Sequence, residues 1–144
     1  MFAASSESLS VLSQNIQMLT TVFFVCVDDS IGRFDKSMLS QQTLMELFIF
    51  GLDKVEDICG SRDDPREVCT WEGVECNSNG EVEGFECSFY GPDGTGTIDF
   101  KFLPCSLTEI NMSNNALNGT IELADLPENM KRLHLLENAL SGTL

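Results

Sequence analysis

The stretch Gly96-Thr97-Ile98 returns as Gly119-Thr120-Ile121 and again as Gly142-Thr143-Leu144, each time 23 residues further along the chain. Residues between these stretches repeat at the same spacing of 23. Leu103-Pro104 returns as Leu126-Pro127, Leu107 as Met130, Ile110 as Leu133, Met112 as Leu135 and Asn115 as Asn138. An earlier, atypical copy has Val82, Phe85, Cys87 and Tyr90 at the corresponding offsets, with two extra residues before the next copy. Self-similarity at one period indicates a chain built from stacked copies of one unit.

Each copy predicts one short strand. Ile110 and Met112 alternate with polar residues, so they point to one face of a strand, and Asn115 follows where the chain turns out of it. We expect parallel neighbouring strands centred near Glu86, Asn111 and His134, because successive coils run the same way. The residues predicted to be buried are Phe85, Cys87, Ile110, Met112, Leu133 and Leu135.

A period of roughly 20–29 residues with the spacing L-x-x-L-x-L-x-x-N is the signature of leucine-rich repeats. The chain resembles this family, and the resemblance implies an α/β solenoid with a short parallel sheet. The alternative is a small α/β domain in which leucines fall at this spacing by chance.

The segment before the repeats predicts a helix that begins at a Ser40 N-cap and ends at Gly60. Its expected apolar face carries Leu44, Leu47, Phe48, Gly51, Val55 and Ile58. An acidic loop follows, then Cys69-Thr-Trp71-Glu-Gly73-Val74-Glu-Cys76 and a turn ending at Gly80.

This order resembles the plant-type N-terminal cap of leucine-rich repeat proteins, as in plant receptor-kinase ectodomains, polygalacturonase-inhibiting proteins and protist surface proteins, including those of kinetoplastids. The resemblance covers about residues 38–144. It implies a disulfide between Cys69 and Cys76 and a Trp71 packed beneath the first coil.

These features divide the sequence into three ranges. Residues 1–27 are a signal peptide or an apolar N-terminal segment, because residues 18–27 form an apolar run too short to span a bilayer. Residues 28–80 are the cap, and residues 81–144 are about two and a half repeats. Because the sequence stops three residues into a new copy, we expect a truncated chain, whose missing part carries a membrane segment, a kinase or more repeats.

The net charge of -15 and the pI near 4.1 argue against nucleic acid as a partner and against direct binding to anionic membranes. Membrane attachment is expected only through a segment missing from this chain. Six cysteines without a C-x-x-C pair fit an oxidising compartment better than a zinc site. The partners of Cys59, Cys87 and Cys105 are left open by the sequence.

No catalytic, metal or cofactor site is predicted. A set of Ser113, His134 and Glu86 can be drawn, but it lies on an open surface without an oxyanion hole. We therefore expect a non-catalytic binding module of an extracellular or cell-surface protein that recognises a protein, peptide or glycan on its strand face. The alternatives are a soluble inhibitor or structural surface-coat protein, and a cytosolic scaffold.

The candidate binding residues are the outward positions of the three strands. They are Glu83, Glu86, Thr108, Glu109, Asn111, Ser113, Lys131, Arg132, His134 and Leu136, flanked by Gly84, Ser88, Phe89, Asn114 and Glu137. The face should be acidic near the cap and basic in the last coil. Asn111 and Asn118 are candidate N-glycosylation sites. A glycan on Asn111 would occupy the middle of the face, so either that site is unused or ligands bind elsewhere.

Overall fold

The computed structural model describes residues 35–87 and 95–143. The chain divides into two compact units, Met1–Met38 and Leu39–Leu144. In the first unit the described part contains a 3-10 helix, η1, at Lys36–Met38. The expected signal peptide, the apolar run and the boundary at residue 28 lie outside the described residues, as do Ser88, Phe89 and Tyr90. All the elements that follow belong to the second unit.

The predicted N-terminal helix is present, but it is shorter than expected. Helix α2 spans Gln41–Ile49 and begins at the predicted N-cap, where the Ser40 hydroxyl accepts a hydrogen bond from the Thr43 amide at 3.1 Å. It buries Leu44, Met45, Phe48 and Ile49. A second helix, α3, spans Val55–Cys59 and ends at the expected Gly60. The prediction of one continuous helix was therefore wrong.

Helix α2 ends early because the residues that follow it form hydrogen bonds with the edge of a sheet. Leu52 forms an antiparallel bridge with Gly96, and the Thr97 amide donates to the Gly51 carbonyl at 2.9 Å. A side chain at Gly96 would meet that carbonyl at 2.5 Å, so glycine permits the close approach of the two backbones. With the helix ending here, Leu47 is 39% exposed rather than buried.

Four strands form the first sheet, in the order β1-β2-β4-β6. Strand β1 (Val74–Cys76) pairs antiparallel with β2 (Val82–Glu86), and β2 pairs parallel with β4 (Glu109–Asn111), which pairs parallel with β6 (Arg132–His134). The predicted parallel register is confirmed, because Phe85, Ile110 and Leu133 are direct partners.

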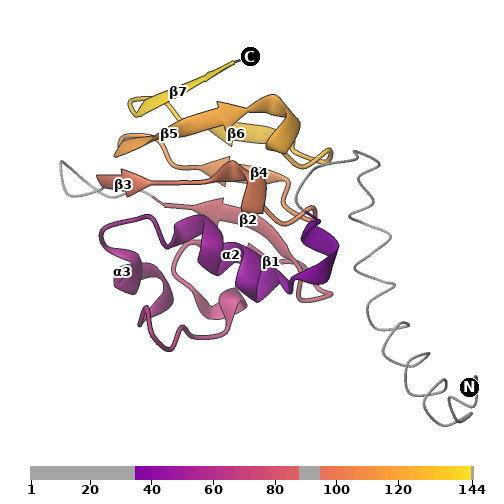
Figure 1. Cartoon of the computed structure of the whole chain (residues 1–144). Helices are drawn as coiled ribbons and strands as arrows, with labels where there is room; N and C mark the ends of the chain where they lie inside the picture. Colours follow the sequence, from indigo (N-terminus) through magenta and orange to yellow (C-terminus); the bar gives the residue numbers. More distant parts are fainter. Residues whose placement is uncertain (1–34, 88–94, 144) are drawn as a thin grey trace, which may run out of the picture. The chain divides into compact units, whose positions relative to one another are not determined.

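A second parallel sheet was not predicted. Strands β3 (Thr95–Thr97), β5 (Ala116–Glu122) and β7 (Ala139–Thr143) follow in chain order and carry the repeated Gly-Thr stretch (Figure 1). A side chain at Gly119 would lie 2.9 Å from the carbonyl of Ile98, the residue that follows β3. The recurring glycine therefore allows successive coils to pack closely. Short 3-10 helices, η3 (Phe100–Phe102) and η4 (Leu123–Asp125), follow β3 and β5.

The core contains side chains of both sheets and of α2. Phe85, Ile110 and Met112 are buried as predicted, whereas Leu133 and Leu135 are only half-buried. Among the described residues, no strand pairs with the outer edge of β6, so one side of these leucines lacks a neighbour.

The asparagine that closes each strand bonds the backbone of its own coil and of the coil before it. The Asn115 amide nitrogen donates to the carbonyls of Cys87 and Met112, both at 2.9 Å. Asn138 repeats this arrangement on Met112 (2.8 Å) and Leu135 (3.0 Å). These bonds satisfy carbonyls that the turn leaves without strand partners.

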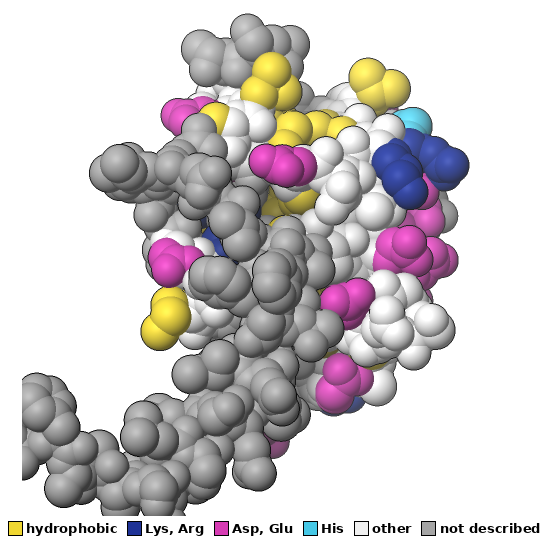
Figure 2. Space-filling view, turned by 90° about the vertical axis from the view of Figure 1, so that its right-hand side faces the viewer, with side chains coloured by type: hydrophobic (Ala, Val, Ile, Leu, Met, Phe, Trp, Pro, Cys, Tyr) yellow, Lys and Arg dark blue, Asp and Glu magenta, His cyan; other side chains and the backbone are white. Residues whose placement is uncertain are grey.

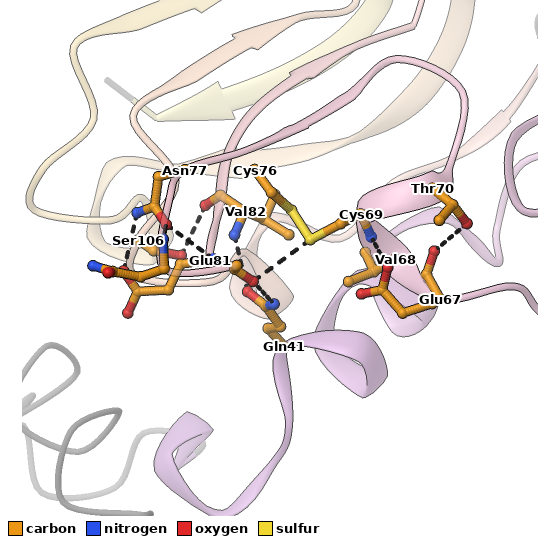
Figure 3. Close-up of a disulfide and its surroundings, with 12 residues drawn as sticks. Gln41, Glu67, Val68, Cys69, Thr70, Cys76, Asn77, Glu81, Val82 and Ser106 are labelled. Atoms are coloured by element: carbon orange, nitrogen blue, oxygen red, sulfur yellow. Dashed lines mark hydrogen bonds between the residues drawn. A yellow bond between two sulfur atoms is a disulfide. The ribbon is translucent and has the colours of Figure 1, made fainter.

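The disulfide that the resemblance implies is present between Cys69 and Cys76, with Cα atoms 5.7 Å apart (Figure 3). Beside it, the Gln41 side chain binds the β2 end of the hairpin. It donates to the Gly80 carbonyl (2.6 Å) and accepts from the Val82 amide (2.9 Å). The first residue of α2 is thereby attached to the turn that leads into β2.

The remaining cysteines differ in state. Cys59 and Cys87 are buried free thiols, which confirms the prediction for Cys87, and Cys105 is disulfide-bonded. Trp71 is buried in the core and donates its indole N–H to the Arg66 carbonyl at 2.7 Å. No helix among the described residues has the length and apolar character needed to cross a bilayer.

Candidate binding face

The outward side chains of β2, β4 and β6 form rows across the first sheet. Gly84, Glu109 and Arg132 are direct partners in one row. A second row consists of Glu86, Asn111 and His134. The structure therefore brings the candidate residues together as the repeat pattern predicted. We call this surface, including β1, the strand face.

Three polar contacts lie in the middle of the strand face. Arg132 forms an ion pair with Glu109 at 2.8 Å, and both side chains are substantially exposed, so this pair contributes little to stability. The side-chain nitrogen of Asn111 donates to a Glu86 carboxylate oxygen at 3.5 Å. The side-chain oxygen of Asn111 accepts a hydrogen bond from the backbone N–H of Ser113 at 3.3 Å. Asn111 is half-buried.

Charge changes sign across the strand face. Glu83 and Glu86 are exposed on β2, whereas Arg132 is exposed on β6 and Lys131 is exposed just before it. Figure 2 shows the histidine and a basic group gathered above a group of acidic side chains. With strands about 4.8 Å apart, the change of sign occurs over roughly 10 Å. Leu136, which is 74% exposed, adds an apolar contact beside the basic end.

Sequence reasoning missed one member of this surface. Glu75 on β1 is exposed and pairs with Gly84, and its carboxylate lies 3.4 Å from where a Gly84 side chain would begin. It extends the acidic end by one strand. The alternation Val74-Glu75-Cys76 was a signal for a strand, but nothing local placed that strand beside β2 in the antiparallel direction.

The geometry separates the groups of the possible triad. Asn111 lies between Glu86 and His134 in the row, so the backbones of these two residues are two strands apart, about 10 Å. Among the described residues, the Glu86 carboxylate is bonded to the Asn111 side chain rather than to His134.

The two glycosylation candidates lie on different sheets. Asn111 is at the centre of the strand face, and Asn118 is exposed on β5 in the second sheet. A glycan on Asn118 would not occupy the centre of the strand face.

No family model matches the sequence, and no curated protein matches it significantly. The structure is similar to a solved structure described as the crystal structure of a Pollen Receptor Kinase 3, with a TM-score of 0.53 and 21% sequence identity over 69% of this chain. This chain spans 48% of the length of that chain. At this identity the likeness demonstrates a shared fold alone.

Proposed function

We propose that this chain is a non-catalytic leucine-rich repeat module of the secretory pathway whose strand face binds a protein, peptide or glycan. The proposal rests on one observation, the alignment of side chains in rows across that face. Equivalent residues of successive repeats stand side by side across parallel strands, so their side chains form one continuous, open surface. Surfaces of this kind are what repeat proteins use for binding.

The charge pattern supports a polar, asymmetric ligand. Carboxylates dominate at β1 and β2, and cationic side chains at β6. A ligand with its basic end toward the cap and its acidic end toward β6 would be attracted in one orientation and repelled in the other.

The disulfides support an oxidising compartment. The Cys69–Cys76 bond closes the cap loop, and Cys105 is also bonded. Disulfides persist in secreted and cell-surface proteins and are rare where thiols are kept reduced. The fold shared with a receptor kinase structure is compatible with a receptor-like role.

The test is a peptide-display selection against the chain produced with its disulfides intact. The affinities of the selected peptides are then measured for the variant Lys131→Glu/Arg132→Glu, in which the charge at the basic end of the strand face is reversed. The charge-matched control is Lys36→Glu/Lys54→Glu, which changes two lysines that lie outside the strand face and outside the pocket described below. We expect selected peptides to lose about tenfold or more in affinity on the face variant, equivalent to about 1.4 kcal/mol. Equal loss on the control variant would refute the proposal.

A further inference from the structure

A pocket of about 420 Å³ lies at the carboxyl ends of β3 and β5 and shares no residue with the strand face. The end of α2, helix η3 and helix η4 complete its walls. Its volume is within the range of sites that hold small molecules or short peptide segments, about 300–1,000 Å³. The position follows from the helix break, because ending α2 at Ile49 brings Gly51 against Thr97 and leaves a hollow beside them.

The lining of the pocket is supported by the rigid core. Phe48 and Ile98 are 0% and 4% exposed, so they pack behind the lining and offer a ligand almost no surface. The Phe48 ring packs edge-on against Phe85 and Phe100, with centroids 6.0 and 5.9 Å away. The apolar surface that a ligand can reach comes from Leu47, which is 39% exposed, and from the half-buried Phe102. It rests on side chains that are already packed, so it is preformed rather than assembled on binding.

The rim is acidic. Asp99, Glu122 and Asp125 all line the pocket, together with the hydroxyl-bearing Thr97 and Thr120. The combination of accessible apolar side chains with a carboxylate rim suits a cation carried on an apolar stem, because the stem removes apolar surface from water while the cation stays at the rim.

The rim already holds one cation of the chain itself. The Lys101 ammonium lies 2.7 Å from a carboxylate oxygen of Asp99 and 4.8 Å from the centroid of the Phe102 ring. Asp99 and Phe102 both line the pocket. This edge thus binds an ammonium group through a carboxylate and an aromatic face together, which is the chemistry that an incoming basic side chain would use. Lys101 is 45% exposed, so it can move aside.

We propose that this pocket binds a short segment of a partner protein through an arginine or lysine whose stem lies on Leu47 and Phe102 and whose cation meets Glu122 and Asp99. The pocket is larger than one side chain, which leaves room for the residues flanking the basic one. The net charge of -15 would speed the approach of such a segment. The proposal is independent of the strand face, because the two surfaces have no residue in common.

The test uses N-acetyl-Leu-Arg-Leu-amide as the probe, titrated into the isotope-labelled chain with amide chemical shifts as the readout. The same peptide with citrulline in place of arginine is the neutral control, and agmatine tests a free guanidine without peptide. We expect saturable shifts at Thr97, Asp99 and Glu122 with the arginine peptide and much weaker effects with the other two. Shifts confined to Glu83 and Glu86, or equal binding of the citrulline peptide, would overturn the site. Equal binding of agmatine would overturn the peptide as ligand.

Two matched variants test the rim. Glu122→Gln removes a rim charge, whereas Glu128→Gln removes an exposed charge outside the pocket. We expect the first to weaken the arginine peptide about fivefold and the second to leave its affinity unchanged. Equal effects of both would mean attraction to the overall charge alone and would overturn the proposal. Because both side chains are exposed, neither change should unfold the chain.

Discussion

Ile110 and Leu133 occupy the same place in two successive coils, yet Ile110 is fully buried and Leu133 is half-exposed. Met112 and Leu135 differ in the same way. The inward positions of both coils carry large apolar side chains, so the difference in burial comes from their neighbours. β4 has a paired strand on each side, whereas β6 has one on one side only among the described residues. In a stack of this kind, a coil obtains its stability from the coils beside it as much as from its own residues.

The largest expected effect follows from this difference. Ile110→Ala should lower the free energy of unfolding by about 3–4 kcal/mol, and Leu133→Ala by about 1–2 kcal/mol, because only the first change leaves an enclosed cavity. Urea denaturation of the two variants, with the disulfides intact, measures both values. Equal losses would mean that the two coils are equally enclosed, contrary to the comparison.

A second prediction concerns the contact between the cap and the first coil. Gly96 and Gly80 both have positive φ, 130° and 77°, but only Gly96 has backbone within contact of an added side chain. Gly80→Ala should therefore cost about 1 kcal/mol from strain alone, and Gly96→Ala about 2 kcal/mol or more, because the cap must also move. Thermal or urea unfolding of the two variants measures both losses, and the difference between them reports the cost of displacing the cap backbone. If Gly96→Ala is no worse than Gly80→Ala, the close contact of Gly51 with β3 is not required for stability.

These contacts also explain which features the sequence could predict. The rows of the strand face follow from one period, because residues at equal offsets in parallel coils must become neighbours. The helix break does not follow from local pattern. Leu52 continues the helical spacing, but its bridge to Gly96 lies 44 residues along the chain, and only the assembled stack provides that partner. The second sheet had a signal in the repeated Gly-Thr stretch, and burial alternates along β5, but the inward positions are Leu117, Gly119 and Ile121, so a glycine interrupts the apolar pattern in the sequence.

The two candidate sites also differ in how far the sequence could predict them. The strand face was predictable residue by residue, apart from Glu75, which joins it through an antiparallel hairpin. The acidic pocket was predictable only in part. Thr97 and Thr120, Asp99 and Glu122, and Phe102 and Asp125 each stand one 23-residue period apart, but the wall formed by residues 47–51 lies outside the repeats and shares no such spacing.

A smaller effect is expected at alkaline pH in the first coil, where Cys87 stands in the inward row with Met112 and Leu135. Burial raises the pKa of the Cys87 thiol from 9.0 to about 12. In the unfolded chain this thiol loses its proton near pH 9, whereas in the folded chain it keeps the proton until about pH 12. The unfolded state is therefore favoured as pH rises through this window, and the free energy of unfolding should fall by up to about 1.4 kcal/mol per pH unit.

Cys87→Ala should reduce that slope, and urea denaturation at pH 8.5, 9.5 and 10.5 compares the variant with the parent chain. Burial raises the pKa of Cys59 as well, so a slope in the same direction should persist in the variant. The same slope in both chains would show that Cys87 is not enclosed as the structure indicates.

Residue-resolved hydrogen exchange of the native chain tests most directly the central claim, that the coils form one stack ordered from its capped end. Amides of β2 and β4 should exchange slowest, close to the rate set by global unfolding, and amides of β6 and β7 should exchange faster through local opening of the last coil. The peptide units compared are chemically alike, so the contrast reports on neighbours. Protection of β6 equal to or greater than that of β4 would contradict the account.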